Sequence, residues 1–316
     1  MNHLLRSRAP VSDAGWELLD QEARGRLAPA LAARKLVDFS GPHGWEYSAT
    51  NLGRTSPVET RSGEGVSVLK RSVLPLVEVR ADFELRRAEL RDADRGADDA
   101  DLAALDTAAH RIARAENLAV FHGYAGAMAG IAEASPHEPT KLGAAADAYP
   151  RKVAGAVEQL LCSGIAGPYG LALGRDQYRR VVETAEHGGY PLLDHLRKIL
   201  EGPIVWAPGV NGAIVLSMRG GDFKLECGQD LAIETDPDAL AVMRDAQGEE
   251  FKHFSMDLEF LLRRVRPWRE VAEGILFQEG DIVEHGEEAE EETFEGGAAP
   301  HSDGSLGIGS LKGALR

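Results

Sequence analysis

The chain has 316 residues, a formal net charge of −16 at pH 7, and 43% hydrophobic and 27% charged residues. This composition is ordinary for a globular protein, and the acidic balance argues against general nucleic-acid binding. Because no run of about 18 or more apolar residues is present, no membrane span is expected. The start of the chain lacks the apolar core of a signal peptide, and two cysteines, Cys162 and Cys227, are too few for a disulfide framework. A reducing cytoplasm is the expected compartment.

Residues 1–233 alternate short helical patterns with short runs rich in β-forming residues, with frequent glycine and proline between them. Two such runs lie at 66–69 and 204–207. The pattern predicts a mixed α+β domain over 1–233.

From about residue 234 the pattern becomes helical. Apolar residues recur at steps of three and four, at Phe251, Phe254, Leu258, Leu261 and Val265. The spacing predicts one amphipathic helix over 236–265, ended by Pro267, and a second helical stretch over 268–278. Residues 234–278 are therefore expected to form a short helical hairpin.

The remainder of the chain is acidic and then rich in glycine. Eleven acidic residues and no lysine or arginine lie between Glu270 and Glu295. We expect a disordered linker over 279–303. In the last segment, 304–316, the apolar residues Leu306, Ile308 and Leu311 alternate with glycine and serine, which suits either a flexible tail or an extended peptide that binds in shallow pockets.

Six separated motifs occur in the first part of the chain, at residues 8–10 (RAP), 41–47 (GPHGWEY), 95–97 (RGA), 167–169 (GPY), 183–191 (ETAEHGGYP) and 219–223 (RGGDF). In identity and order they resemble the linocin-like family of encapsulin shell proteins. The resemblance covers about 1–233. It implies a phage-capsid-type fold of the Hong Kong 97 class and self-assembly into a closed icosahedral cage. Such a cage would enclose cargo such as a ferritin-like protein or a peroxidase. Read by themselves, the same residues are turn and core residues.

The resemblance also implies particular roles for a few residues. His187, Gly188, Gly189 and Tyr190 fall in the segment similar to the family's five-fold pore loop, although a solvated loop is the simpler interpretation. Some family members bind flavin through a tryptophan and a tyrosine. Here Ala88 stands at the tryptophan position, so flavin is not expected. No catalytic motif occurs before residue 236, and the shell is expected to be non-enzymatic and to need no cofactor.

Three further motifs follow, at residues 236–240 (DPDAL), 249–253 (EEFKH) and 258–264 (LEFLLRR). They resemble the second helix of encapsulated ferritin, and this resemblance covers about 236–290. Glu250 and His253 lie three apart and would share one helix face, the spacing of a di-iron site. A charged pair on a solvated helix face remains the alternative. The ligand set is incomplete, because the family's earlier glutamate-bearing helix is absent, so iron binding and a ferroxidase function form the rival hypothesis.

Residues 305–312 (SLGIGSLK) resemble the cargo-loading peptide of encapsulin systems. The sequence thus predicts a shell subunit joined near Ile233 to a ferritin-derived fragment and a loading peptide. We expect this peptide to occupy a docking site on its own or a neighbouring subunit and to compete with cargo. A fusion that neither assembles nor binds iron is the third possibility.

Overall fold

The computed structural model describes residues 4–9, 11–59, 66–143, 145–186, 188–235, 243–244, 250–264, 274–278, 306, 308–310 and 312. Its first half contains the helices and strands η1 (Arg6–Arg8, a 3₁₀ turn), α1 (Asp13–Ala30), α2 (Ala33–Leu36), β1 (Asp38–Ser40), β2 (Ala49–Pro57), β3 (Leu69–Pro75), β4 (Val77–Arg86), α3 (Arg87–Asp94), α4 (Ala103–His122), β5 (Gly123–Tyr124), β6 (Met128–Ala129), α5 (Ile131–Ala134) and β7 (Thr140–Lys141).

The second half contains η2 (Ala146–Ala148, a 3₁₀ turn), α6 (Tyr149–Cys162), β8 (Tyr169–Leu173), α7 (Arg175–Glu183), α8 (Leu192–Leu200), β9 (Ile204–Trp206), β10 (Ala213–Ser217), β11 (Phe223–Cys227), β12 (Ala232–Glu234), β13 (Met243–Arg244), β14 (Glu250–Arg264) and β15 (Gly274–Gln278). This mixture of helices and strands confirms the predicted α+β class. Strand β9 lies within the predicted run 204–207, and β3 begins at Leu69, the last residue of the predicted run 66–69.

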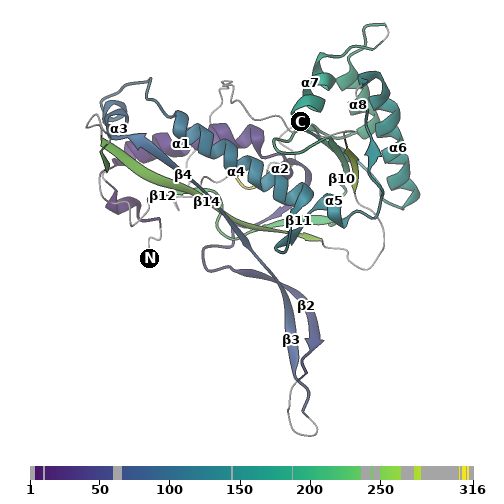
Figure 1. The fold of residues 1–316 in the computed structure, drawn as a ribbon, viewed down its shortest axis with the longest axis horizontal. Coiled ribbons are helices and arrows are strands. Elements are labelled where there is room, and N and C mark those ends of the chain that lie inside the picture. The colour runs from purple at the N-terminus through teal and green to yellow at the C-terminus, as the bar shows by residue number, and fades with distance from the viewer. Residues whose placement is uncertain are drawn as a thin grey trace.

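A long strand, β14, lies at the centre of the main six-stranded sheet. It pairs along one edge with β4 and along the other with β11, β12 and β13 in succession, all antiparallel. Helices α1 and α4 pack together and run along the sheet (Figure 1). The residues after 234 therefore complete the main sheet.

The predicted helices over 236–265 and 268–278 are wrong where the structure describes these residues. Strand β14 buries Phe254, Met256, Leu258 and Phe260 completely, at every second position, as a strand does. The period of two is present in the sequence of 254–260 (FSMDLEF), but the three-and-four spacing of the same apolar residues competed with it. The short helical hairpin predicted for 234–278 is replaced by β13, β14 and β15.

The predicted boundary at 233/234 is also not a structural one, because β12 runs across it from Ala232 to Glu234 and pairs with β14. The linker predicted over 279–303 lies outside the described residues. No helix in the described ranges is long and apolar enough to span a membrane.

A second sheet of five strands, in the order β7-β15-β10-β8-β9, lies with helices α6, α7 and α8 at one end of the molecule (Figure 1). It has its own apolar core, which includes Tyr149, Leu171, Leu196 and Val215. Strand β15 pairs antiparallel with β10 and parallel with β7. The segment after residue 234 thus contributes a strand to both sheets.

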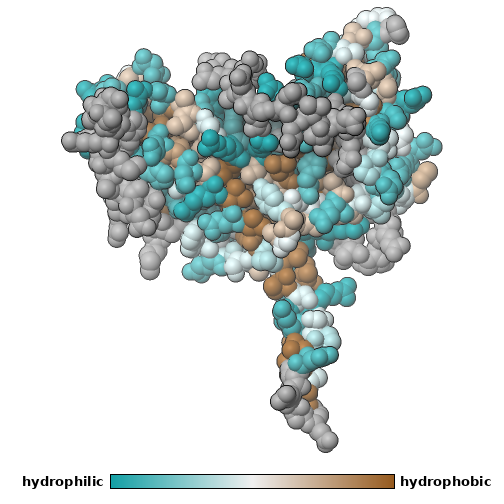
Figure 2. All heavy atoms as spheres, viewed as in Figure 1, coloured by the Kyte–Doolittle hydropathy of each residue, from teal (hydrophilic) through white to brown (hydrophobic). Residues whose placement is uncertain are grey.

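Strands β2 and β3 form a two-stranded arm that projects from the body of the molecule (Figure 1). Apolar side chains are exposed along it, including Leu52, Val66, Val68, Leu69 and Val73. Figure 2 shows apolar (brown) atoms at several points along the described part of the arm, with the largest patch where the arm leaves the body. Among the described residues, β2 and β3 pair only with each other, and a two-stranded ribbon of this kind is at best marginally stable in water.

Candidate functional site

The described residues of the tail, which are 306, 308–310 and 312, contact α1, α2 and the turn after β11, and the surface that they contact is called the groove below. The amide of Leu306 donates a hydrogen bond to the carbonyl of Leu231 at 2.7 Å, and Arg24 Nε donates to the carbonyl of Leu306 at 2.5 Å. Leu306 is fully buried and Ile308 is almost so, and both belong to the main apolar core. Two of the three apolar residues predicted to dock, Leu306 and Ile308, are therefore packed against the shell-like part. Leu311 lies outside the described residues.

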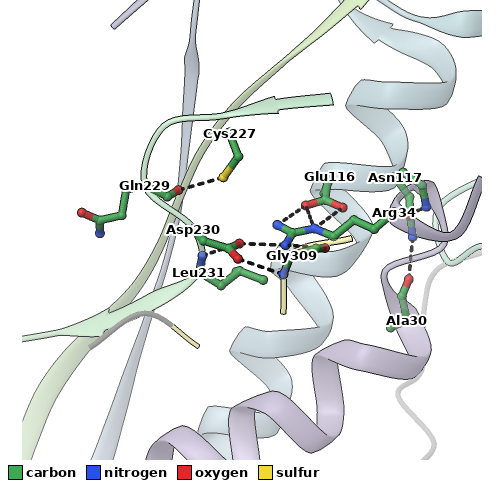
Figure 3. A network of polar contacts seen from close by, with 10 residues as sticks. Ala30, Arg34, Glu116, Asn117, Cys227, Gln229, Asp230, Leu231 and Gly309 are labelled. Atoms are coloured by element: carbon green, nitrogen blue, oxygen red, sulfur yellow. Dashed lines mark hydrogen bonds and ion pairs between the residues drawn. The ribbon is translucent and has the colours of Figure 1, made fainter. Parts of the chain in front are cut away.

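The floor of the groove is a buried network of three charged residues, Arg34, Glu116 and Asp230 (Figure 3). Arg34 on α2 lies 2.8 Å from Glu116 Oε2 through Nη2 and 2.7 Å from Asp230 Oδ1 through Nη1. All three side chains are at most 1% exposed. Burial by itself lowers the pKa of Arg34, but the charges of Glu116 and Asp230 outweigh it and raise the pKa above its ordinary value. The arginine therefore stays charged, and the network keeps one net negative charge when both carboxylates are ionised.

This network contacts the tail through the backbone of Gly309. The amide of Gly309 donates to Asp230 Oδ2 at 3.0 Å, and Arg34 Nη1 donates to the carbonyl of Gly309 at 3.3 Å. Asp230 Oδ1 also accepts from the amide of Leu231 at 2.9 Å. Oδ1 of Asp230 is therefore bound by Arg34 and by the amide of Leu231, whereas Oδ2 binds the tail (Figure 3).

Asn117 on α4 fixes the position of Arg34. Its side-chain amide donates to the carbonyl of Ala30 at 2.9 Å, and its oxygen accepts from the amide of Ala33 at 3.1 Å. These bonds satisfy backbone groups at the end of α1 and the start of α2, where no helical partner is available. The junction that aims Arg34 into the groove is therefore attached to α4.

At the edge of the groove the tail makes an ion pair with the body. Lys312 Nζ lies 2.6 Å from Asp38 Oδ1, and the other oxygen of Asp38 accepts from the amide of Gly221 at 2.6 Å. Burial raises the pKa of Asp38, but the hydrogen bonds from Lys312 and Gly221 outweigh it, so that the net pKa is lowered. Sequence reasoning missed Arg24, Arg34, Asp38 and Asp230, because charged residues scattered over 200 positions carry no spacing signal.

The metal-site hypothesis for Glu250 and His253 rested on a shared helix face, and that face does not exist. Both residues lie on β14, where positions three apart have opposite parity. His253 pairs across the strands with Glu84, at 3.6 Å, and lies 3.9 Å from Asp82. Within the described part of the chain, no three His, Cys, Asp or Glu residues are placed to hold a metal ion. The helix spacing on which the di-iron hypothesis was based is therefore not present on β14.

Three of the four predicted pore residues, Gly188, Gly189 and Tyr190, lie on the loop between α7 and α8. Ala185 and Pro191 form an isolated bridge, and the amide of Glu186 donates to the carbonyl of Tyr190 at 2.8 Å. Gly188 and Gly189 have φ of 96° and 79°, conformations that favour glycine. The exposed Tyr190 ring lies under Lys198 Nζ at 4.9 Å. His187 lies outside the described residues.

A second buried acidic cluster joins three strands of the main sheet. Arg80 on β4 lies 2.8 Å from Asp257 on β14 and 2.5 Å from Glu234 on β12. Burial raises the pKa of Asp257 to about 7, with a further contribution from the neighbouring Glu234 carboxylate and only a partial offset from Arg80. One arginine therefore pairs with two buried carboxyl groups, and Asp257 stays protonated until the pH approaches its raised pKa of about 7.

The chain is similar to known proteins of two kinds. A family model described as "Encapsulating protein for peroxidase" matches residues 1–239. A type 1 encapsulin shell protein of Rhodospirillum rubrum is 47% identical over 249 residues, which cover 77% of this chain and 89% of that protein. An encapsulated ferritin-like protein of the same organism is 40% identical over 92 residues, 27% of this chain and 64% of that protein.

Among solved structures, the fold is similar to a virus-like particle from Pyrococcus furiosus. The TM-score is 0.51 at 17% sequence identity, and the match covers 80% of this chain and 96% of that one. At this identity the likeness concerns the fold alone. The predicted phage-capsid-type fold is confirmed, whereas its predicted helical extension is replaced by strands.

Proposed function

The chain belongs to the family of encapsulin shell proteins, and we propose that its copies assemble into a closed icosahedral cage whose docking groove is occupied by the chain's own tail. The buried position of Leu306 beside Leu231 carries the second half of this proposal. The first half is supported by the exposed apolar residues of the arm. The family description names a peroxidase as the enclosed protein, and one relative of the chain is an encapsulated ferritin-like protein, so we propose cargo of these kinds.

The arm supports assembly because its exposed apolar residues need a surface to cover them. Val66 is 63% exposed and Leu69 is 57% exposed, close to where the described part of the arm ends. A hollow of about 800 Å³ at the base of the arm, lined by Leu52, Leu74 and Leu262 among others, offers an apolar surface of the required kind. We propose that this hollow receives the arm of a second copy, since exposed apolar patches of this kind mark association sites.

Electron microscopy of the purified full-length chain tests assembly, with an arm variant beside it. Replacing Val66, Val68 and Leu69 together by serine should leave folded subunits that no longer form cages, because the arm loses its apolar contacts. Lys70→Ser, on the same exposed arm, is the matched control and should leave cages intact. Cages that persist in the triple variant would show that the arm does not hold the shell together.

The occupied groove predicts competition with cargo. The tail and groove belong to one chain, so the effective concentration of the tail exceeds that of a cargo protein in solution. Deleting residues 304–316 should raise the amount of a fluorescent protein, tagged at its own end with residues 304–316, that is loaded into cages. Equal loading with and without the deletion would refute self-occupancy.

The loop that carries Gly188, Gly189 and Tyr190 is proposed as the pore loop, with His187 beside it. The support is its narrow shape, its glycines in left-handed conformations and its exposed tyrosine. Tyr190→Ala should speed the entry of a small quencher into cages loaded with a fluorescent protein. An unchanged quenching rate would remove this loop from the permeation path.

We propose that the shell is a container without enzymatic activity and that it is located in the cytoplasm. We also propose that it binds neither flavin nor iron nor nucleic acid. The absence of tryptophan at Ala88 and the acidic net charge support these points. The rival ferroxidase hypothesis loses its geometric basis with the helix it required. Iron-dependent oxygen consumption that is abolished by His253→Ala would restore it.

A further inference from the structure

The docking groove fixes the backbone of one tail residue at both of its polar groups. We infer that the groove selects the residue at position 309 by its backbone conformation, and therefore accepts extended apolar peptides only when they carry a glycine, or another residue tolerant of left-handed φ, at this point. The inference rests on the proposed function, in which the groove holds a loading peptide. It adds which peptides the groove takes.

The first step is the conformation itself. Gly309 has φ of 48°, close to the left-handed region, where L-residues other than asparagine and aspartate are uncommon. A Cβ added there would meet nothing closer than Phe39 Cε1 at 3.9 Å, an ordinary van der Waals contact. Space therefore does not exclude a side chain at position 309. The restriction comes from the backbone dihedral angle.

The second step is that this dihedral angle is imposed by the groove. The amide of Gly309 must point to Asp230 Oδ2, and its carbonyl must accept from Arg34 Nη1. Both bonds involve the same residue, so together they restrict its φ and ψ. An occupant that relaxed to an extended φ would move at least one of these groups out of line and leave a buried charged partner without it.

The third step is that the groove side cannot follow such a relaxation. Asp230 is anchored on its other oxygen by Arg34 and by the amide of Leu231, and Arg34 is anchored by Glu116. These groups are almost fully buried. Moving Asp230 would separate buried opposite charges, which is costly. The network of Arg34, Glu116 and Asp230 thus restricts the backbone conformation of the bound peptide at position 309.

The peptide class follows from the order of contacts. Leu306 and Ile308 are buried in the groove, and Lys312 makes an ion pair with Asp38 at its edge. Between them, the backbone of Gly309 is hydrogen-bonded to Asp230 and Arg34. The groove is therefore suited to extended tails in which two apolar residues are separated by one residue, followed at once by a residue of left-handed conformation and, three positions later, by a cation. A tail with the same apolar residues and an L-alanine after them should bind poorly.

Synthetic peptides test this directly, because they allow both alanine enantiomers. The receptor is the full-length chain carrying Leu306→Asp and Ile308→Asp, which removes its own tail from the groove without altering the groove. Fluorescently labelled peptides of residues 304–316 carry glycine, L-alanine, D-alanine or asparagine at position 309, and affinity is read by fluorescence polarisation. L-alanine at the exposed position 310 is the matched control.

D-alanine should bind within about twofold of glycine, because a D-residue prefers positive φ, and L-alanine should bind about tenfold more weakly. Asparagine should fall between them. The control at position 310 should bind like the parent peptide. Equal affinity for both alanine enantiomers would overturn the conformational selection while leaving docking intact. Failure of the parent peptide to bind would overturn the docking proposal itself, and this inference with it.

Discussion

The rings of Phe83 and Phe254 stack with centroids 5.4 Å apart and planes inclined by 18°. Trp16 meets the same Phe254 ring edge-on at 5.7 Å. Phe254 lies beyond residue 239, where the match of the family model ends, whereas Phe83 and Trp16 lie inside that match. The segment after 234 is therefore built into the core of the shell-like fold.

Phe254→Ala should lower the free energy of unfolding by about 3–5 kcal/mol, because it empties a fully buried aromatic site between two other rings. Urea denaturation followed by circular dichroism measures this change. Glu17→Ala, at an exposed position of α1, is the control and should stay within about 0.5 kcal/mol. A similarly small effect for Phe254→Ala would mean that β14 is not part of the cooperative core.

Arg34→Ala should destabilise the chain by about 3–5 kcal/mol, since it leaves two buried carboxylates, Glu116 and Asp230, without their cation. Thermal and urea unfolding both measure it. Arg95→Ala breaks the exposed pair with Asp92 and should cost between about 0 and 1 kcal/mol. Equal effects of the two variants would contradict the burial of the Arg34 network.

Stability should depend on pH through Asp257. Its pKa is raised to about 7 in the folded chain, chiefly by burial, from an ordinary value of 3.8. Between these values the folded chain holds a proton that the unfolded chain releases, so the free energy of unfolding falls as the pH rises through this window.

Asp257→Asn should flatten that slope in melting temperatures measured across the same pH range. Part of the slope should remain, because burial also raises the pKa of Asp106 to about 6. Parallel curves for the parent chain and Asp257→Asn would show that Asp257 titrates normally.

Lys312→Met should weaken tail docking by about two- to fivefold, because it removes the ion pair with Asp38 but keeps most of the apolar stem. Hydrogen exchange of the tail amides reports docking. In the parent chain, docking should weaken with added salt and as the pH falls through the lowered pKa of Asp38, whose charge the docked state favours. Ser310→Ala should keep both dependences, and a salt response that persists in Lys312→Met would assign it to another pair.

The amino-acid sequence predicted the outline of this protein better than its second half. The motifs from residues 8–10 to 219–223 led to the shell family and its fold, and the resemblance of 305–312 to a cargo-loading peptide led to a docked tail. Both patterns are read from short stretches of sequence, so neither depends on knowing which residues are in contact in the folded chain. The segment of β14 carried two periods at once, at three-to-four and at two residues, and local spacing alone did not decide between them.

What the sequence by itself determined was the composition and the identity of the motifs, and the resemblance of these motifs to known families led to the shell fold and to the docking of Leu306 and Ile308. The tertiary structure decided that β14 is a strand, because β4 along one edge and β11, β12 and β13 along the other offer it backbone partners that a helix at this place would leave unpaired. The tertiary structure also decided which charged residues bind the backbone of Gly309. Arg34, Glu116 and Asp230 are separated by 82 and by 114 residues along the chain, and only the packing of α2 and the turn after β11 against α4 brings their charges together in a buried groove.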